Sequence, residues 1–171
     1  MRRNPAYTIL LALCDSSGKG NGMRRILKNT INTLIVLAAI LILIQPIQVD
    51  RTNPPVQSDI PAEPDIKPIL QRSCYNCHSN ETDWPWYSYI APASWLTVNT
   101  VRNGRSHLNF SEWESYAIKM QYRKLEDIAE EAIGKEMPPW YYVIMREEAD
   151  LTVTDRGQVW AWAVTESETL F

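Results

Sequence analysis

Apolar residues form one long run near the N-terminus of this chain and shorter helical stripes further on. The run is strict from Leu34 to Ile44 and extends over residues 31–49 when four polar residues are tolerated. A helix that crosses a membrane needs about 20 predominantly apolar residues, and the longer count comes close to that length. A basic cluster precedes the run, which is the order found in a secretory signal or a signal anchor. We therefore expect a membrane helix within residues 23–49.

The flanks of this segment predict its processing and its orientation. No small-x-small cleavage site follows the run, which favours an uncleaved anchor over a removed signal. The basic residues Arg24, Arg25 and Lys28 precede it, so we expect the N-terminus in the cytoplasm and the domain in the periplasm or another extracytoplasmic space, anchored to the cytoplasmic membrane. Residues 1–22 stand before a complete signal, so we interpret them as an upstream extension and expect translation to start at Met23.

The rest of the chain predicts a spacer and then a helical domain. Residues 50–64 are rich in proline and polar side chains, a composition typical of an extended, semi-rigid tether. From residue 65 to residue 171, apolar positions recur with helical spacing, and no alternating strand pattern is evident. We therefore expect an all-α domain whose helices span 65–72, 93–102 and 111–133, with a last helix starting at Thr154-Asp155.

The last two of these helices carry the clearest signals. Ser111 to Glu114 reads as a capping box, in which the glutamate side chain returns to the serine backbone and opens the helix. The inward face of that helix is expected to hold Trp113, Tyr116, Ala117, Met120, Leu125, Ile128 and Ala132. The last helix should face inward with Val159, Trp162 and Ala163. Gly157 lies inside it, costs about 1 kcal/mol relative to alanine, and is expected to shorten its start.

Composition and charge then narrow the class of partner. All seven tryptophans lie between Trp84 and Trp162, so the last hundred residues have many large side chains to bury. Residues 1–50 hold six basic and two acidic residues; subtracting these from the totals of 17 and 20 leaves 11 basic and 18 acidic residues, a net charge of −7. An acidic domain of this kind argues against nucleic acid as a partner.

One five-residue stretch carries recognisable chemistry. Cys74, Cys77 and His78 form a Cys-x-x-Cys-His pattern, which is the attachment signature of c-type haem outside the cytoplasm. The spacing lets both thiols bond to the vinyl groups on one edge of the porphyrin and makes the histidine the proximal iron ligand. We therefore expect one covalent haem c held by these three residues.

Other uses of the two cysteines agree less well with the rest of the sequence. A structural zinc site needs four ligands, and the only further candidates are Cys14 and His107. A thioredoxin-like redox site would follow a strand in a βαβ unit, whereas these flanks look helical. A disulfide between Cys74 and Cys77 would close a tight, strained loop.

The second axial ligand has to come from elsewhere in the chain. Met137 is the first choice, because its loop follows the helix-ending Gly134 and is stiffened by Pro138 and Pro139. His107 is the alternative, and a site that is open or filled by water is a third. The remaining methionines of the domain are weaker candidates: Met120 and Met145.

Two further interpretations concern the surroundings of the haem. Arg102 and Arg105 are candidate partners of the haem propionates, since arginine forks fit carboxylates. Asn80-Glu81-Thr82 matches the N-glycosylation pattern, and we interpret it as a chance match beside a haem motif.

Several longer segments, in order along the chain, resemble a known family. They are CYNCHSNETDWPWYSYIAPASWL from Cys74, GRSHLNFSEW from Gly104, MPPWYYVIM from Met137 and VWAWA from Val159. Together they resemble the bacterial haem-binding domain family with a CxxCHSNET-type signature, which is similar to small mono-haem c-type cytochromes. The resemblance implies a cytochrome c-like helical domain, with attachment at Cys74 and Cys77, His78 as proximal ligand and Met137 as distal ligand.

The sequence therefore predicts a membrane-tethered, extracytoplasmic haem protein that transfers single electrons between redox partner proteins and carries out no substrate chemistry of its own. Two other functions stay open. One is a haem-based sensor with an exchangeable sixth site, and the other is a small peroxidase, for which His107 is the only histidine available as distal acid or base.

Overall fold

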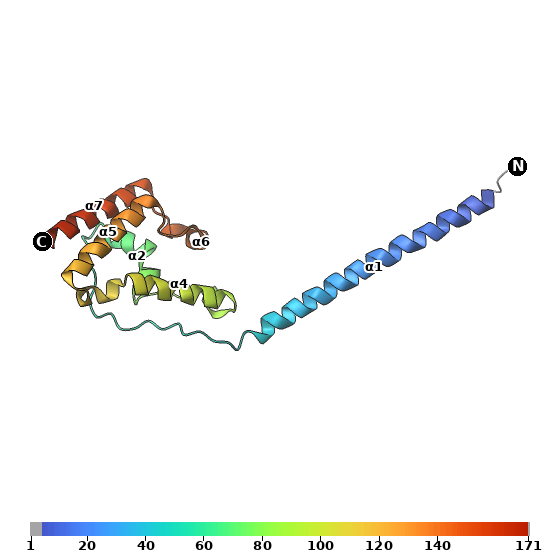
Figure 1. Ribbon diagram of the computed structural model, residues 1–171, viewed down its shortest axis with the longest axis horizontal. Coiled ribbons are helices and arrows are strands. Elements are labelled where there is room, and N and C mark those ends of the chain that lie inside the picture. The colour runs from blue at the N-terminus through green and yellow to red at the C-terminus, as the bar shows by residue number, and fades with distance from the viewer. Residues whose placement is uncertain (1–4, 171) are drawn as a thin grey trace. The chain divides into compact units, whose positions relative to one another are not determined.

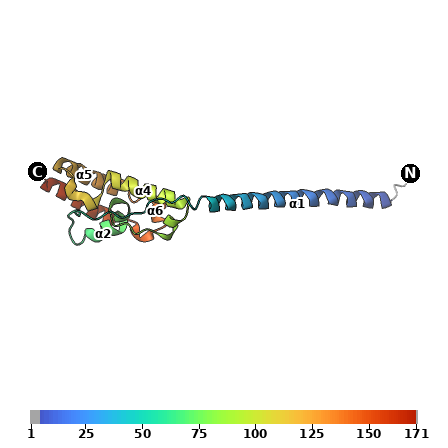
Figure 2. The same ribbon diagram turned by 90° about the horizontal axis from the view of Figure 1, so that it is seen from below.

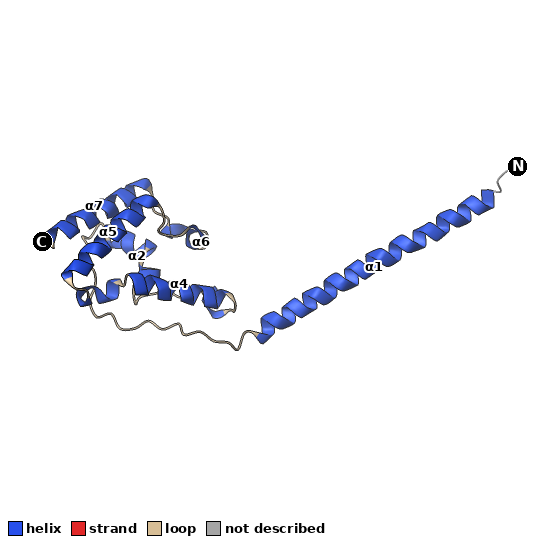
Figure 3. Ribbon diagram, in the orientation of Figure 1, coloured by secondary structure: helices blue, strands red, loops and turns tan. Residues whose placement is uncertain are grey.

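The computed structural model describes residues 5–170, and their side chains from Gly22 onward (Figure 1). The chain divides into two compact units, one up to Gln48 and one from Val49 on. Across residues 5–170 the regular structure consists of helices, with no strand (Figure 3). The predicted all-α class is therefore confirmed.

The first unit contains one long helix, α1, from Pro5 to Leu43. Its part Gly22–Leu43 has a mean hydropathy of 2.1 over its most apolar window and is long enough to cross a membrane, as a signal sequence or an anchor would be. The helix ends six residues before the predicted boundary at residue 49. Pro46 explains the early end, because proline lacks the backbone N–H and disfavours helical geometry in the residue before it.

The second unit is built from short helical elements. In chain order they are α2 Lys67–Ser73, α3 Tyr75–His78, η1 Trp86–Tyr89, α4 Ala93–His107, η2 Phe110–Ser115, α5 Ile118–Gly134, α6 Trp140–Val143, η3 Glu147–Ala149 and α7 Val153–Thr169. Helices α5 and α7 lie side by side (Figures 1 and 2), and Figure 1 shows α4 on the other side of the domain. The turn α3 packs on α4, so the Cys-x-x-Cys-His stretch stands between the α4 side and the α5–α7 pair.

A single core holds the α5–α7 pair against α2 and η2. Its members are apolar residues from α2, α3, η2, α5, α7 and the segments before α2 and α7: Ile60, Ile66, Ile69, Leu70, Tyr75, Phe110, Trp113, Leu125, Ala129, Ala132, Leu151, Val159, Trp162 and Ala163. The prediction that Val159, Trp162 and Ala163 face inward is confirmed. Helix α7 begins at Val153, capped by the Thr152 and Asp155 side chains, so Gly157 does not shorten it.

The predicted helix over 111–133 is wrong in its first third. Residues 110–115 form the 3₁₀ turn η2, and α5 starts only at Ile118. The expected capping box is absent because the buried Ser111 hydroxyl accepts a hydrogen bond from the Asn80 N–H instead, at 2.9 Å. Two residues expected in the core, Ala117 and Met120, are exposed as a result, the methionine by 43%.

Helix α4 is longer than predicted and runs through Gly104 to His107. The glycine is required for packing and does not end the helix: a Cβ at this position would lie 2.4 Å from the Cys77 carbonyl oxygen. Absence of a side chain therefore lets α4 approach the backbone of the Cys-x-x-Cys-His turn directly.

The proline-rich segment 50–64 has no regular structure, but it is part of the second unit and does not hang free of it. The N–H groups of Gln57 and Ser58 both donate to the Ser111 carbonyl, at 2.9 and 3.2 Å. Ile60 is only 2% exposed and belongs to the core. The domain therefore starts near Val49, whereas the sequence places its boundary at residue 65, because composition alone does not reveal these contacts.

Candidate haem site

The two cysteines and the histidine of the motif lie on one helical turn. Cys74 ends α2 and caps α3, and the N–H groups of Cys77 and His78 both donate to its carbonyl, at 3.1 and 2.9 Å. Cys74 and Cys77 are free thiols. All three side chains are partly exposed because they face the two cavities described next.

Two cavities, of about 360 and 420 Å³, meet at the motif. Cys74, His78, His107 and Met137 line both of them. The first cavity extends between α5 and the η2 region and is lined mainly by apolar side chains: Leu108, Phe110, Ile128, Ala132, Leu151 and Val159. The second extends along α4 and α6 and includes Cys77. The four shared residues therefore stand where the two cavities adjoin.

His78 is oriented by the backbone that follows α4. Its Nδ1 lies 3.1 Å from the Leu108 carbonyl oxygen, and the Phe110 ring lies beside it at 6.3 Å between centroids. With Nδ1 donating to the carbonyl, Nε2 is left as the nitrogen that can bind a metal. Burial lowers the pKa of His78, which favours the neutral imidazole that ligates metals.

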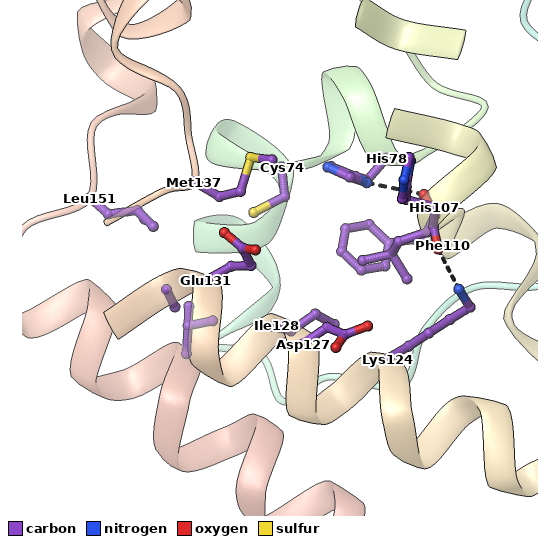
Figure 4. Close-up of a pocket in the computed structure, with 13 residues that line it drawn as sticks. Cys74, His78, His107, Phe110, Lys124, Asp127, Ile128, Glu131, Met137 and Leu151 are labelled. Carbon is purple, nitrogen blue, oxygen red and sulfur yellow. Dashed lines mark hydrogen bonds between the residues drawn. The ribbon is translucent and has the colours of Figure 1, made fainter. Parts of the chain in front are cut away.

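Met137 lies in the loop between α5 and α6. The prediction that Gly134 ends the helix before it is confirmed, and Lys135 then turns the chain with a left-handed backbone at φ 64°. The Met137 side chain is 39% exposed and lines both cavities. Figure 4 shows its thioether on the side of the cavity opposite the histidines, near Cys74.

His107, the alternative distal ligand, lies on the same side of the cavity as His78 (Figure 4). It is the last residue of α4, and its Nδ1 lies 2.8 Å from the Asn103 carbonyl of its own helix. The two histidines therefore do not face one another across the cavity, whereas His78 and Met137 do.

The cysteine pair does not have the properties of a redox dithiol or of a zinc site. Burial raises the pKa of Cys74 to about 12 and that of Cys77 to about 11, whereas reactive CxxC thiols have lowered pKa values. Among the side chains that the structure describes, no three His, Cys, Asp or Glu residues gather to hold a metal ion. Cys14, named above as a zinc candidate, lies outside the described side chains.

The two arginines predicted as partners of the haem propionates, Arg102 and Arg105, line neither of the two cavities. Arg102 is exposed on α4. Arg105 donates hydrogen bonds to four groups of the protein, at 2.7 to 2.9 Å: Ser79 O, Thr52 O, Asn53 Oδ1 and Thr82 Oγ1. These contacts give Arg105 a structural role, because they join the residues after the motif to the proline-rich segment.

The polar residues after the motif are structural. Asn80 is 3% exposed, its amide donates to the Pro55 carbonyl at 3.0 Å, and its Oδ1 accepts from Asn109 at 3.0 Å. A buried amide that is fully engaged in this way is inaccessible for glycosylation, in agreement with the chance match inferred from the sequence. Thr82 likewise donates to the carbonyl of Asn76 at 2.8 Å.

Sequence reasoning missed two groups of residues near the site. The first lies on one face of α5 and brings charge to the first cavity: Lys124, Asp127 and Glu131. Their helical spacing of three and four residues is the signal that could have found them. The second is a hydrogen bond of 2.7 Å from the amide of Asn76, inside the motif, to the hydroxyl of Tyr142 on α6, which no sequence pattern announces.

These features fit a haem. Cys74 and His78 line the first cavity, whose other walls are mainly apolar, as a flat and largely apolar macrocycle requires, and both thiols and the imidazole line the second cavity beside it. Ser73 lines the second cavity and is 5% exposed, and its buried hydroxyl has no hydrogen-bond partner among the described residues. The donor set and the shape of the cavity therefore suit the cofactor that the motif predicts.

Comparison with known proteins gives one positive finding. A family model described as a haem-binding domain matches residues 39–165, which include α2 to α6 and most of α7. No curated protein and no solved structure matches the chain. Because the match covers most of the chain and includes the cavity between the two sides of the domain, this chain belongs to the haem-binding domain family.

Proposed function

We propose that this protein is a c-type haem protein that transfers single electrons outside the cytoplasm while anchored to a membrane. The observation that carries the proposal is that Cys74, His78 and Met137 line the same cavity, with the thioether on the side opposite the imidazole (Figure 4). The iron of a bound haem supplies reversible one-electron chemistry.

Each residue of the site has a separate task in this proposal. Cys74 and Cys77 hold the porphyrin edge through thioether bonds, and His78 is the proximal iron ligand. The Leu108 carbonyl fixes the ring of His78, which raises its strength as a ligand. Met137 is the distal ligand. The apolar walls of the first cavity keep water away and disfavour the ferric charge.

The location follows from the N-terminal unit. The Gly22–Leu43 part of α1 serves as a membrane anchor, and the basic residues that precede its apolar run Leu34–Ile44 keep the N-terminus in the cytoplasm. The haem domain then lies on the other side of the membrane, where c-type haem is attached. Its partners are the membrane and a redox protein. The acidic domain disfavours nucleic acid.

A haem-based sensor is the second candidate, and the exposed Met137 is the observation that favours it. A side chain that is 39% exposed could leave the iron and admit a small ligand. The peroxidase alternative is weaker, because His107 lies beside the proximal ligand and not on the distal side (Figure 4). Electron transfer stays the leading function because Met137 is carried by a loop that the rest of the domain holds in place.

The attachment is tested by replacing both cysteines. We expect the Cys74→Ala/Cys77→Ala variant to lose covalent haem on a denaturing gel stained for haem peroxidase activity. Haem that stays attached in this variant would contradict the proposed linkage.

The ligand set is tested with methionine and histidine variants of the full chain. Met137→Ala should convert low-spin ferric haem to high-spin and abolish the weak far-red band of methionine-ligated iron. Met145→Ala is the matched control, since this methionine is also exposed but lines neither of the two cavities, and it should leave the spectrum unchanged. If His107→Ala changes the spectrum and Met137→Ala does not, the distal assignment is wrong.

A further inference from the structure

Arg156 on α7 is a buried cation whose contacts converge on the loop that carries Met137. The residue is 9% exposed. Its Nη1 donates to the carbonyl of Ala132 at 2.8 Å and to the carbonyl of Met137 at 2.9 Å. Its Nε donates to the Leu151 carbonyl at 3.2 Å. One guanidinium thus joins the end of α5, the loop and the start of α7.

The two contacts of Nη1 lie on either side of the left-handed turn at Lys135. Ala132 lies in the last turn of α5, and Met137 follows after the left-handed turn at Lys135. Hydrogen bonds from an ionised donor are roughly twice as strong as neutral ones. Removing the carbonyl of the loop from Arg156 would also leave a buried charge with fewer partners, which is unfavourable. Both effects hold the loop in one conformation.

The side chain of Met137 has no comparable support. It is 39% exposed, and its cavity neighbours are the other side chains around the candidate iron position. The position of the thioether is therefore determined through the backbone, and the backbone at Met137 is held by Arg156.

We propose that Arg156 is a positioning residue, which sets where the Met137 thioether stands in the haem cavity and keeps the sixth coordination position closed. This rests on the proposed function, in which Met137 is the distal ligand. A lysine at 156 cannot replace it, because a single ammonium group lacks the planar fork that serves three carbonyl groups at once.

The experiment compares three variants of the full-length haem protein. Arg156→Lys is the test, and Met137→Ala shows what complete loss of the ligand looks like. Arg72→Lys is the matched control, because Arg72 also stabilises the start of α7, through Glu148 O at 3.1 Å and Asp155 Oδ2 at 2.7 Å. The readouts are the far-red band of the ferric protein, the affinity for imidazole, and unfolding by denaturant.

We expect Arg156→Lys to weaken the far-red band and to bind imidazole about tenfold more tightly, the size of effect that loss of one charge-assisted hydrogen bond gives. Arg72→Lys should lose comparable stability with an unchanged band and affinity. The inference is overturned, and the distal assignment stands, if Arg156→Lys matches Arg72→Lys in the far-red band and in the imidazole affinity while Met137→Ala loses the band. If Met137→Ala also keeps the band, both are overturned.

A measurement on the unmodified protein decides the question if Arg156→Lys does not fold. Imidazole displaces the distal ligand, and the Nη–H signals of Arg156 should then shift in the nitrogen-resolved NMR spectrum, because Nη1 touches the Met137 carbonyl. The Arg72 signals should stay in place. Arg156 signals that do not move on displacement would show that the loop and the ligand are not coupled through this side chain.

Discussion

The candidate haem site has a proposed proximal side at His78 and a proposed distal side at Met137, and the two sides are held by different means. His78 is contiguous with both cysteines on one helical turn, and the ring itself is fixed by the Leu108 carbonyl at 3.1 Å. Met137 lies far along the chain from that turn, and it is fixed through its backbone carbonyl by Arg156. The proximal side is therefore determined locally, whereas the distal side depends on how α5 and α7 assemble.

This difference says where substitutions should act. Changes beside α3 should damage the domain itself, since α3 packs directly on α4 and the residues after it are fastened to the proline-rich segment. Changes on the α5–α7 side should alter the sixth coordination position while sparing most of the fold. The following predictions test this contrast, from the largest expected effect to the smallest.

The largest effect is expected at Gly104. The added Cβ of Gly104→Ala would lie 2.4 Å from the Cys77 carbonyl oxygen, so α4 and α3 would have to separate. We expect the free energy of unfolding to fall by about 3 kcal/mol or more, as in severe overpacking. Denaturant titration measures it. Gly157→Ala is the control within a helix: nothing lies within 4 Å of its Cβ, and a gain of about 1 kcal/mol is expected. Equal stability of the two variants would contradict the close approach.

The second effect concerns Arg105. Arg105→Ala removes the four hydrogen bonds that join Ser79 and Thr82 to the proline-rich segment, and we expect a loss of about 2–3 kcal/mol in unfolding free energy. Arg102→Ala should stay within about 0.5 kcal/mol of the unmodified protein, because this side chain is exposed. The redox potential should change little in either variant. A large drop in potential in Arg105→Ala would restore the propionate role that the sequence predicts.

The third effect concerns the hydrogen bond between Asn76 on α3 and Tyr142 on α6. Asn76→Ala loses the hydrogen bond to the Tyr142 hydroxyl and the one that it accepts from the Asp83 N–H, so a loss of about 2 kcal/mol is expected. Tyr142→Phe loses only the first of these, and about 1 kcal/mol should follow. Thermal unfolding of both variants gives the comparison. If Tyr142→Phe is less stable than Asn76→Ala, the two hydrogen bonds of Asn76 do not account for the stabilisation.

The smallest effect is expected at Asp155, which caps α7. Burial alone would raise the pKa of this carboxyl, but hydrogen bonds from Thr152 and Arg72 outweigh it and lower the pKa. A lowered pKa in the folded state means that the stabilisation is complete above the ordinary value and is lost as the pH falls through the folded value. Asp155→Asn should therefore cost about 1 kcal/mol at neutral pH, in the range of a lost cap, and progressively less in acid below about pH 4. Unfolding curves at several pH values measure the difference, and a constant difference would contradict this pH dependence.

Sequence reasoning applies best to features that a single local element determines. The Cys-x-x-Cys-His spacing is readable because one helical turn fixes it, and the inward face of α7 is readable because helical periodicity fixes it. The same reasoning ended one helix at residue 102, just before Gly104, and started the next at Ser111, since glycine and serine usually mark such boundaries. Both positions are determined by contacts with residues far away in the chain, namely Cys77 and Asn80.

The residues that hold the distal side could not have been found this way. An arginine on a helix normally reads as a solvated charge, and the burial of Arg156 becomes visible only when α5, the loop and α7 are brought together. The proline-rich segment was misjudged for the same reason. Its composition indicates an extended chain, but composition does not show that Arg105 donates hydrogen bonds to Thr52 and Asn53, which hold this segment to the domain.

The hydrogen bond between Arg156 and residue 137 does not depend on which side chain residue 137 carries. Arg156 binds the carbonyl of residue 137, which every amino acid has, and not the methionine side chain. With the proposed ligation, a histidine at this position would be carried by the same loop, and the iron would receive an imidazole in place of a thioether. In the proposed site, a single substitution at residue 137 would thus change the reduction potential of the haem without altering the loop that carries it, since the identity of the axial ligand is a main determinant of that potential.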